Sequence, residues 1–185
     1  MIIDECRFQL KNNQNALIRS PREEDIPGIL DYLYISAGET EFILRYPEEC
    51  SKYTPEFEKS LIERINQSTN EAMLLCIVDD EIAGMGNISS SQWIKTRHRA
   101  GLGIAILQKY WGLGIGTRLM QELIRIAERD PNILQLELDF VEGNVRAQAL
   151  YEKMGFIITG RKQNSIRLKD GTLLDEISMI RKLDR

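Results

Sequence analysis

Three glycines at alternate positions mark the middle of the chain, directly before an amphipathic helical pattern. The run consists of Gly112, Leu113, Gly114, Ile115, Gly116 and Thr117. The first N–H groups of a helix have no partner within the helix, and the helix dipole is positive at that end. Glycine also lets the backbone approach a bulky anion, so the run predicts a cradle for a phosphate or diphosphate. The alternative is structural: the glycines serve only positive φ angles or close helix–strand packing.

The kind of phosphate follows only partly from this run. A P-loop needs a lysine directly after its last glycine, and none follows Gly116. A dinucleotide-binding Gly-x-Gly-x-x-Gly turn would need glycine where Thr117 stands, although Asp139 lies at a suitable distance for a ribose-binding acid. The surrounding segments do not repeat the parallel strand–helix–strand unit of that fold. Dinucleotide binding is therefore the second hypothesis for this motif.

A second motif extends from Asn144 to Phe156. Asn144 opens a helical pattern that carries Tyr151, and Gly155 ends it at a position that favours left-handed backbone. By itself this motif predicts a helix N-cap and a buried aromatic ring.

Hydrophobic periodicity predicts the elements that must position the two motifs. In chain order we expect a strand at 16–19, helices at 20–37 and from 54, strands at 72–78, 82–85 and 99–107, a helix from 115, a strand at 134–140, a helix from 144, and strands at 156–160 and 175–183. Mostly hairpin-linked strands with one strand–helix–strand unit predict an α/β (α+β) fold with a mixed sheet. The 185 residues fit one domain, which we place at 16–185, with 1–15 as an N-terminal extension packed on it.

With both motifs in register, the chain resembles the GCN5-related N-acetyltransferase superfamily over about residues 16–183. The family pattern Gln/Arg-x-x-Gly-x-Gly/Ala is met from Trp111 to Gly116, with Trp111 in place of the polar residue. The pattern Asn-x-x-Ala-x-x-Leu-Tyr-x-x-x-Gly-Phe is met at every specified position from Asn144 to Phe156. The resemblance implies a mostly antiparallel sheet, flanked by helices, in which two central parallel strands, 99–107 and 134–140, splay apart.

The resemblance also implies acetyl-CoA as cosubstrate and direct attack of an amine on its thioester in a ternary complex. The cofactor-binding residues that it implies are Leu107, Gly112 to Thr117, Asn144 and Tyr151. Backbone amides near Leu107 would pair with the pantetheine arm, and those of the glycine run would hold the diphosphate. Because Trp111 lacks the polar side chain, phosphate binding is left to backbone N–H groups. Tyr151 would act as the general acid on the leaving sulfur.

Several groups are candidates for the general base. Glu137 is the favoured carboxylate, since it lies in the middle of a strand beside the splay and faces away from its apolar neighbours. His98 is a second candidate, because histidine is a common general base in enzymes. Glu39 and Glu41 lie where this superfamily shapes its acceptor site, and could anchor the amine. A water relay is equally compatible with the sequence.

The expected acceptor is the primary amine of a small molecule. A protein N-terminus is the first alternative, and an idle acetyl-CoA-binding regulatory module is the second. The segment from Arg161 to Gly171 resembles the C-terminal hairpin that flanks the acceptor site, with a turn at Asp170-Gly171, and a homodimer through it is compatible with the sequence.

Composition limits the remaining classes of function. A net charge of −4 argues against a general nucleic-acid binder. Three scattered cysteines and one histidine argue against a zinc site or a disulfide scaffold, so we expect no metal. The sequence shows neither a signal peptide nor an apolar run long enough for a membrane span, so we expect a cytoplasmic protein with no membrane partner.

Overall fold

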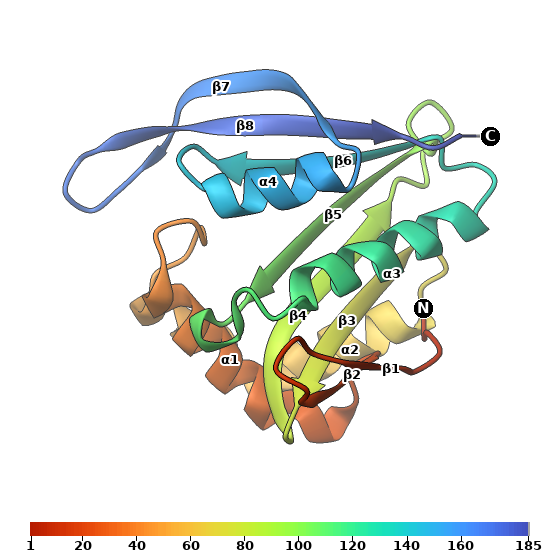
Figure 1. The fold of residues 1–185 in the computed structure, drawn as a ribbon, viewed down its shortest axis with the longest axis vertical. Coiled ribbons are helices and arrows are strands. Elements are labelled where there is room, and N and C mark those ends of the chain that lie inside the picture. The colour runs from red at the N-terminus through yellow and green to blue at the C-terminus, as the bar shows by residue number, and fades with distance from the viewer. Residues whose placement is uncertain (185) are drawn as a thin grey trace.

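In the computed structural model, which describes residues 1–184, eight strands form one sheet in the order β1-β2-β3-β4-β5-β6-β8-β7 (Figure 1). The strands are β1 (Cys6–Gln9), β2 (Asn15–Arg19), β3 (Glu71–Val78), β4 (Glu81–Ser90), β5 (Arg99–Ile106), β6 (Gln135–Val141), β7 (Ile157–Arg167) and β8 (Leu173–Lys182). The helices are α1 (Ile26–Glu39), α2 (Pro55–Gln67), α3 (Ile115–Arg129) and α4 (Val145–Lys153), with short 3-10 turns η1 (Glu23–Asp25), η2 (Pro47–Lys52) and η3 (Gln108–Tyr110).

The pairing of β5 with β6 is parallel, and the other neighbouring strands of the described sheet pair antiparallel. The parallel ladder is short: it joins residues 99–101 to residues 135–137 and then stops. Beyond it, residues 102–106 of β5 and 138–141 of β6 diverge, and we call the gap between these two segments the notch. The predicted mixed sheet with two splayed parallel strands is confirmed.

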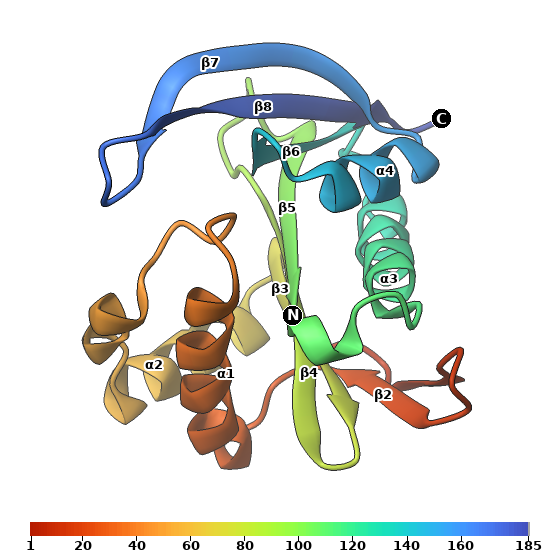
Figure 2. The ribbon, with the colours of Figure 1, turned by 60° about the vertical axis from the view of Figure 1, so that its left-hand side comes forward.

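Helices cover both faces of the sheet (Figure 2). On one face α1 packs on β4 and α2 on β3. On the other face α3 crosses β4 and β5, where a Cβ at Gly86 would lie 3.3 Å from the Leu123 side chain. On the face that carries α1 and α2 no helix lies across β6 (Figure 2), while the Tyr32 hydroxyl of α1 donates to the Ala105 carbonyl of β5 at 2.7 Å. Residues 103–106 of β5, beside the notch, are half-buried.

Local signals in the sequence place several element ends. The Thr54 side chain accepts a hydrogen bond from the Phe57 N–H at 3.2 Å and caps α2, as its residue type predicts. Asp79 and Asp80 both adopt positive φ, 48° and 62°, in the tight β3–β4 turn. Gly155 ends α4 with a φ of 83°, which confirms the left-handed position.

The start of α1 was predicted wrongly, because its capping signal has other partners. The helix begins at Ile26 and not at Ser20. The Ser20 hydroxyl accepts the Ile3 N–H at 3.0 Å, and the Asp25 carboxylate is held in two hydrogen bonds, at 2.6 and 2.7 Å, by the buried Arg19 guanidinium. These long-range contacts outweigh the local tendency of Ser20 to begin a helix.

Two strands differ from the expectation in extent. Residues 6–9, within the expected extension, form β1 and pair with β2 at the edge of the sheet. How the chain divides into an extension and a domain stays a prediction. β7 runs to Arg167, past the predicted end at 160, because it pairs with β8 through two register shifts.

One part of the core lies between the sheet and α3, and another lies under α1 and α2, where Ile29, Tyr32 and Ile62 are buried. Each apolar residue of the α3 stripe is buried, and so is Glu122, whose carboxylate pairs with Arg118 at 3.0 Å and with Arg125 at 2.9 Å. The stripe consists of Ile115, Leu119, Leu123, Ile126 and Ala127. Across residues 1–184, no helix has both the length and the apolar character needed to cross a membrane.

Candidate active site

Backbone groups of β5 line one side of the notch. In an antiparallel pair, alternate residues direct both N–H and C=O toward the partner strand. The Leu107 N–H donates to the Ala83 carbonyl next to β4 at 3.0 Å. By the same alternation the N–H groups of Ile104 and Ile106 point away from β4 and into the notch. The amides near Leu107 that can pair with a ligand there are therefore those of Ile104 and Ile106, while the Leu107 N–H is already used.

The glycine run forms the turn that leads into α3. Gly112 and Gly114 adopt φ angles of 78° and 101°, and an added Cβ at either would have no neighbour within 4 Å. Gly116 permits close packing instead, since a Cβ there would lie 3.0 Å from a terminal methyl group of Leu150 on α4 and 3.1 Å from one of Ile106. The first helical hydrogen bond runs from the Arg118 N–H to the Gly114 carbonyl, which leaves the N–H groups of residues 115–117 without a helical partner. The run thus combines positive φ, close packing and unpaired donors.

Trp111 is held rigidly before this turn. Its indole N–H donates to the Ile106 carbonyl at 2.7 Å, and the Arg146 guanidinium lies 4.3 Å from the indole ring centroid. This is a cation–π contact, and it brings a positive charge from the first turn of α4 to the glycine turn. Sequence reasoning missed Arg146, which occupies an unspecified position of the second motif.

The second motif places Asn144 and Tyr151 on the same side of the sheet as the glycine turn. The Asn144 side chain accepts the Ala147 N–H at 3.2 Å as the N-cap of α4. Tyr151 is 6% exposed, and its ring centroid lies 5.8 Å from that of Phe140 and 6.3 Å from that of Phe156. Its hydroxyl makes no hydrogen bond within residues 1–184, and burial raises the pKa of Tyr151 to about 12. The hydroxyl stays protonated at neutral pH and is free to donate.

The candidate bases occupy different places. Glu137 lies on the last rung of the β5–β6 ladder, where its carboxylate contacts Arg99 at 3.3 Å and Gln135 at 2.8 Å. His98 lies at the opposite end of β5 from the notch. The Glu39 carboxylate accepts the backbone N–H of Gln108 at 2.7 Å, so it anchors η3.

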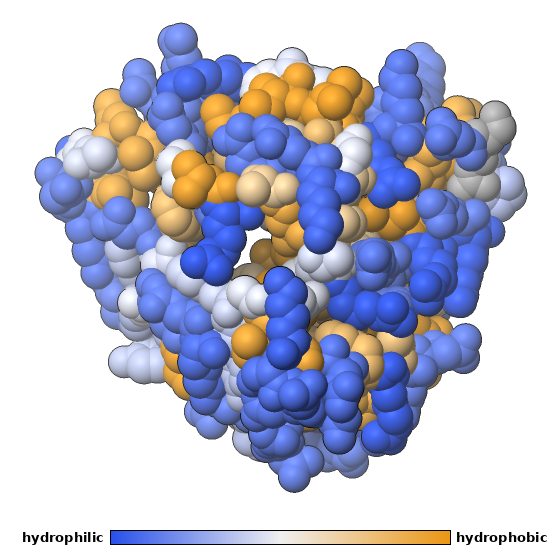
Figure 3. All heavy atoms as spheres, viewed as in Figure 1, coloured by the Kyte–Doolittle hydropathy of each residue, from blue (hydrophilic) through white to orange (hydrophobic). Residues whose placement is uncertain are grey.

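The C-terminal hairpin reaches the segment between α1 and α2. The hairpin turns at Gly171, with a φ of 91°, as predicted. At its tip the Lys169 N–H donates to the Tyr46 hydroxyl at 3.0 Å, and the Lys169 ammonium both lies 4.2 Å from the Tyr46 ring centroid and pairs with Glu48. These contacts tie the tip of the hairpin to the segment between α1 and α2. Figure 3 shows the molecule hollowed between β5 and α4, with hydrophilic residues along much of the rim.

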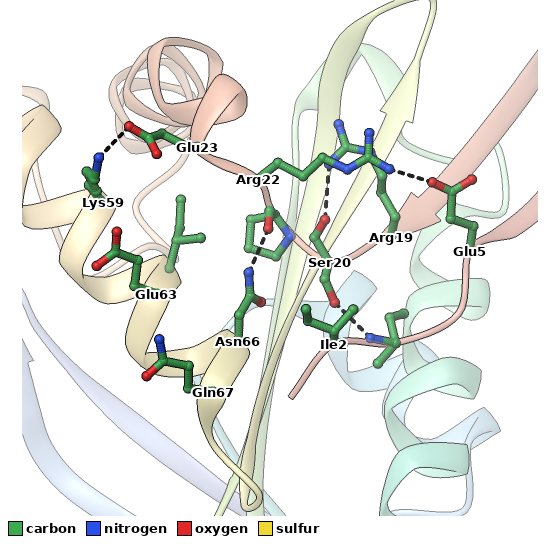
Figure 4. A pocket seen from close by; sticks show the side chains of 13 residues that line it. Ile2, Glu5, Arg19, Ser20, Arg22, Glu23, Lys59, Glu63, Asn66 and Gln67 are labelled. Carbon is green, nitrogen blue, oxygen red and sulfur yellow. Dashed lines mark hydrogen bonds and ion pairs between the residues drawn. The ribbon is translucent and has the colours of Figure 1, made fainter.

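Two pockets lie outside the notch itself. One, of about 340 Å³, is lined by Gly101 and Glu137 on the open face of the sheet, at the foot of the notch. The other, of about 430 Å³, lies between α2 and the segment after β2, with the ion pairs Arg22–Glu5 and Lys59–Glu23 at opposite ends (Figure 4). The larger pocket contains none of the predicted site residues, so we assign the chemistry to the notch.

Comparison with known proteins agrees with this arrangement. The family model described as "Acetyltransferase (GNAT) family" matches residues 40–156, more than half of the chain. A crystal structure of a GNAT-family acetyltransferase from Streptococcus pneumoniae is 28% identical, with a TM-score of 0.85 over 91% of this chain and 99% of that chain.

Two curated relatives match a shorter stretch. They are a kanamycin resistance protein of Rhizobium radiobacter and an aminoglycoside N(6')-acetyltransferase type 1 of Klebsiella pneumoniae, each 33% identical over 60 residues, or 32% of this chain. The match spans 52% of the first relative's length and 28% of the second's.

Proposed function

The chain belongs to the acetyltransferase (GNAT) family, and on that footing we propose that it transfers the acetyl group of acetyl-CoA directly to a primary amine. One observation carries the proposal. The glycine turn at the start of α3 and Tyr151 on α4 lie on one side of the sheet, beside the notch, and no helix lies across β6 on the other side. In this proposal the two substrates meet in the notch from opposite faces.

Backbone groups provide most of the coenzyme A site in this proposal. The N–H groups of Ile104 and Ile106 pair with the amide groups of the pantetheine arm, in the manner of an added strand. The unpaired N–H groups at the start of α3 bind the diphosphate, where the helix dipole also favours negative charge. The Asn144 amide nitrogen remains free to donate, because its oxygen is the one used in the cap. Arg146 adds a positive charge beside the turn.

In the reaction, the lone pair of the amine attacks the thioester carbon, the carbon–sulfur bond breaks, and the electron pair leaves on sulfur. The Tyr151 hydroxyl stabilises that developing thiolate by hydrogen bonding. With its pKa raised to about 12, Tyr151 is a weaker acid than an ordinary thiol such as cysteine, at about 8.5. Tyr151 therefore contributes most as a hydrogen-bond donor while the negative charge forms on sulfur. Its proton can pass to the thiolate afterwards, and solvent then restores the proton to Tyr151.

The amine must lose a proton to become nucleophilic. We assign this step to Glu137, acting directly or through a water, because it lies on the open face at the rung where the strands part. Its contact with Arg99 at 3.3 Å is longer than a strong charge-assisted bond of about 2.8 Å, so the carboxylate can take another partner. A water relay to bulk solvent is the alternative for this step.

The acceptor is proposed to be a small molecule. Two curated relatives are named for kanamycin resistance and aminoglycoside acetylation, which makes amino-bearing antibiotics the first compounds to test. A protein N-terminus is the second class of acceptor to test.

The experiment is thiol release from acetyl-CoA with a panel of primary amines, including kanamycin, spermidine, single amino acids and short peptides with free N-termini. We expect release above the acceptor-free rate with at least one amine. Calorimetric titration with coenzyme A is run beside it. Tight binding without release for any amine would overturn the transferase proposal in favour of an acetyl-CoA-binding module.

A further inference from the structure

Two large apolar side chains lie next to each other in the loop between β4 and β5, residues 91–98. Trp93 is 81% exposed and Ile94 is 80% exposed. The loop runs beyond the ends of both strands (Figure 1). Single exposed apolar residues are common on protein surfaces, but two adjacent ones form a contiguous patch, and patches of this kind mark contact sites. We call Trp93 and Ile94 the apolar tip.

Hydrogen bonds within the loop hold its backbone in one turn. The N–H groups of Thr96 and Arg97 donate to the Trp93 carbonyl at 2.9 and 2.8 Å. At the base of the turn the hydroxyls of Ser91 and Thr96 share a hydrogen bond of 2.7 Å, and the Trp93 N–H donates to the Ser91 hydroxyl at 3.2 Å. The turn is therefore ordered before any partner arrives, so that docking costs little conformational entropy.

Positive charge flanks the apolar tip. Lys95 and Arg97 are exposed, and within residues 1–184 their side chains form no ion pair. The loop itself contains no acidic residue, since the sequence has no Asp or Glu between Glu81 and Glu122. The chain as a whole has a net charge of −4. The loop therefore combines apolar surface with a local excess of cations in an acidic protein, which fits a partner with an anionic surface above an apolar layer.

The size and shape of the patch favour a lipid surface over other partners. A stable protein–protein interface buries about 800 Å² on each partner, and two side chains on a projecting loop offer only a fraction of that area. A single-stranded nucleic acid would stack bases on Trp93 but would gain no stacking from the aliphatic Ile94. In a lipid surface an indole and an aliphatic side chain enter the layer below the headgroups, while lysine and arginine stay beside the anionic headgroups.

We propose that this loop docks the protein on an anionic lipid surface. Trp93 and Ile94 insert at the level of the headgroups, and Lys95 and Arg97 contact the anionic groups of the lipids. The expectation of no membrane partner was drawn from the lack of a membrane-spanning segment, which a contact of this kind does not require. The proposal does not depend on the transferase function.

Docking through the apolar tip leaves the notch accessible. The loop precedes β5, whereas the notch lies beside residues 102–106, toward the other end of that strand. Ile104, whose N–H points into the notch, lies about 17 Å along the strand from Arg99. Substitutions at the apolar tip should therefore leave coenzyme A affinity unchanged in the absence of lipid.

Co-sedimentation with lipid vesicles at low ionic strength tests the proposal. One set of vesicles contains phosphatidylcholine alone, and the other contains phosphatidylcholine and phosphatidylserine in equal amounts. We expect the full chain to bind the second set about tenfold or more strongly, because each cation near an anionic surface contributes about fivefold. Trp93→Ala should lower this binding about tenfold or more, since the indole supplies most of the apolar area of the tip. Phe57→Ala removes an exposed aromatic ring from α2 and is the control.

A charge-matched pair of variants tests the cations separately. Lys95→Gln with Arg97→Gln should lower binding to phosphatidylserine-containing vesicles by about 25-fold at low salt and by much less at high salt. Lys153→Gln with Arg167→Gln removes two exposed cations elsewhere on the chain, and should have a much smaller effect. Equal losses from the two double variants would mean that net charge alone drives binding, and would overturn the assignment to this loop.

Tryptophan fluorescence reads the insertion directly. The chain has two tryptophans, so Trp111→Phe leaves Trp93 as the reporter. Its emission should shift to the blue on phosphatidylserine-containing vesicles, and lipids brominated on the acyl chain should quench it. Failure of the wild-type chain to bind these vesicles, or binding that Trp93→Ala does not weaken, would overturn the proposal. Trp93-dependent binding to single-stranded DNA, or Trp93-dependent self-association in sedimentation velocity, in place of vesicle binding would overturn it in favour of a nucleic acid or a second copy of the chain.

Discussion

Replacing Tyr151 by phenylalanine removes one hydroxyl group and leaves the ring in place. The ring is packed between Phe140 and Phe156, and the hydroxyl makes no hydrogen bond within residues 1–184, so no internal hydrogen bond is lost. We expect the free energy of unfolding to change by less than about 1 kcal/mol. Catalysis should respond much more strongly. A hydrogen bond to a charged group contributes about 1.5–3 kcal/mol, which corresponds to a kcat lower by roughly 10- to 150-fold.

The assay is thiol release at saturating acetyl-CoA and acceptor, together with calorimetric titration of coenzyme A. Coenzyme A affinity should stay within about twofold of wild type, because the effect lies in the transition state. Tyr34→Phe makes the same chemical change at an exposed position of α1 and serves as the control. A kcat for Tyr151→Phe within twofold of wild type would remove Tyr151 from the mechanism.

The pH profile gives a second readout for the same residue. Tyr151 acts in its protonated form, and its pKa is raised to about 12, so the rate should not fall through loss of this proton up to pH 10. A decline in the alkaline limb near pH 10 that is absent from Tyr151→Phe would mean that the hydroxyl titrates as an ordinary tyrosine.

Three further predictions follow from the cofactor site and the core. Arg146→Ala should weaken coenzyme A binding by roughly 1 kcal/mol, about fivefold, at low salt and by less at high salt, because Arg146 is an exposed cation. Arg146→Lys, which keeps the charge, should bind coenzyme A about as well as wild type. A calorimetric titration of Arg146→Ala that shows no salt-dependent loss of affinity would contradict this role. Gly114→Ala forces a side chain onto a φ of 101° and should cost about 1–2 kcal/mol in urea unfolding, and equal stability would contradict the strain. Glu58 is 2% exposed, and its carboxylate makes no hydrogen bond within residues 1–184. Burial raises the pKa of this carboxyl against the opposing charge of Arg45. Because the pKa of this carboxyl is higher in the folded than in the unfolded protein, the free energy of unfolding falls as pH rises. Glu58→Gln should therefore have a higher Tm than wild type at pH 7.5, and the difference should shrink toward pH 4. An equal Tm of the two proteins at both pH values would refute the assignment.

Local patterns predicted the elements that contain the two motifs. The helical stripe from Ile115 to Ala127, the cap at Thr54 and the left-handed Gly155 all depend on interactions within a few residues, and each is present. The splayed strands were predicted from the family resemblance, because their divergence depends on the register between β5 and β6.

Long-range partners account for what the sequence did not reveal. Glu39 was one of several candidate anchors for the amine, and its carboxylate holds the N–H of Gln108, a residue far along the chain. Ser20 bonds Ile3 and does not begin α1. Arg146 reaches Trp111 because α4 packs on the start of α3, and the sequence of neither segment predicts this contact. Contacts of this kind are set by tertiary packing, which periodicity does not encode.

The central claim is direct transfer between two substrates that meet in the notch. Initial rates measured over a matrix of acetyl-CoA and acceptor concentrations test it most directly. We expect double-reciprocal lines that intersect, since both substrates must be bound before the acetyl group moves. Parallel lines would indicate an acetylated enzyme intermediate and would contradict the account.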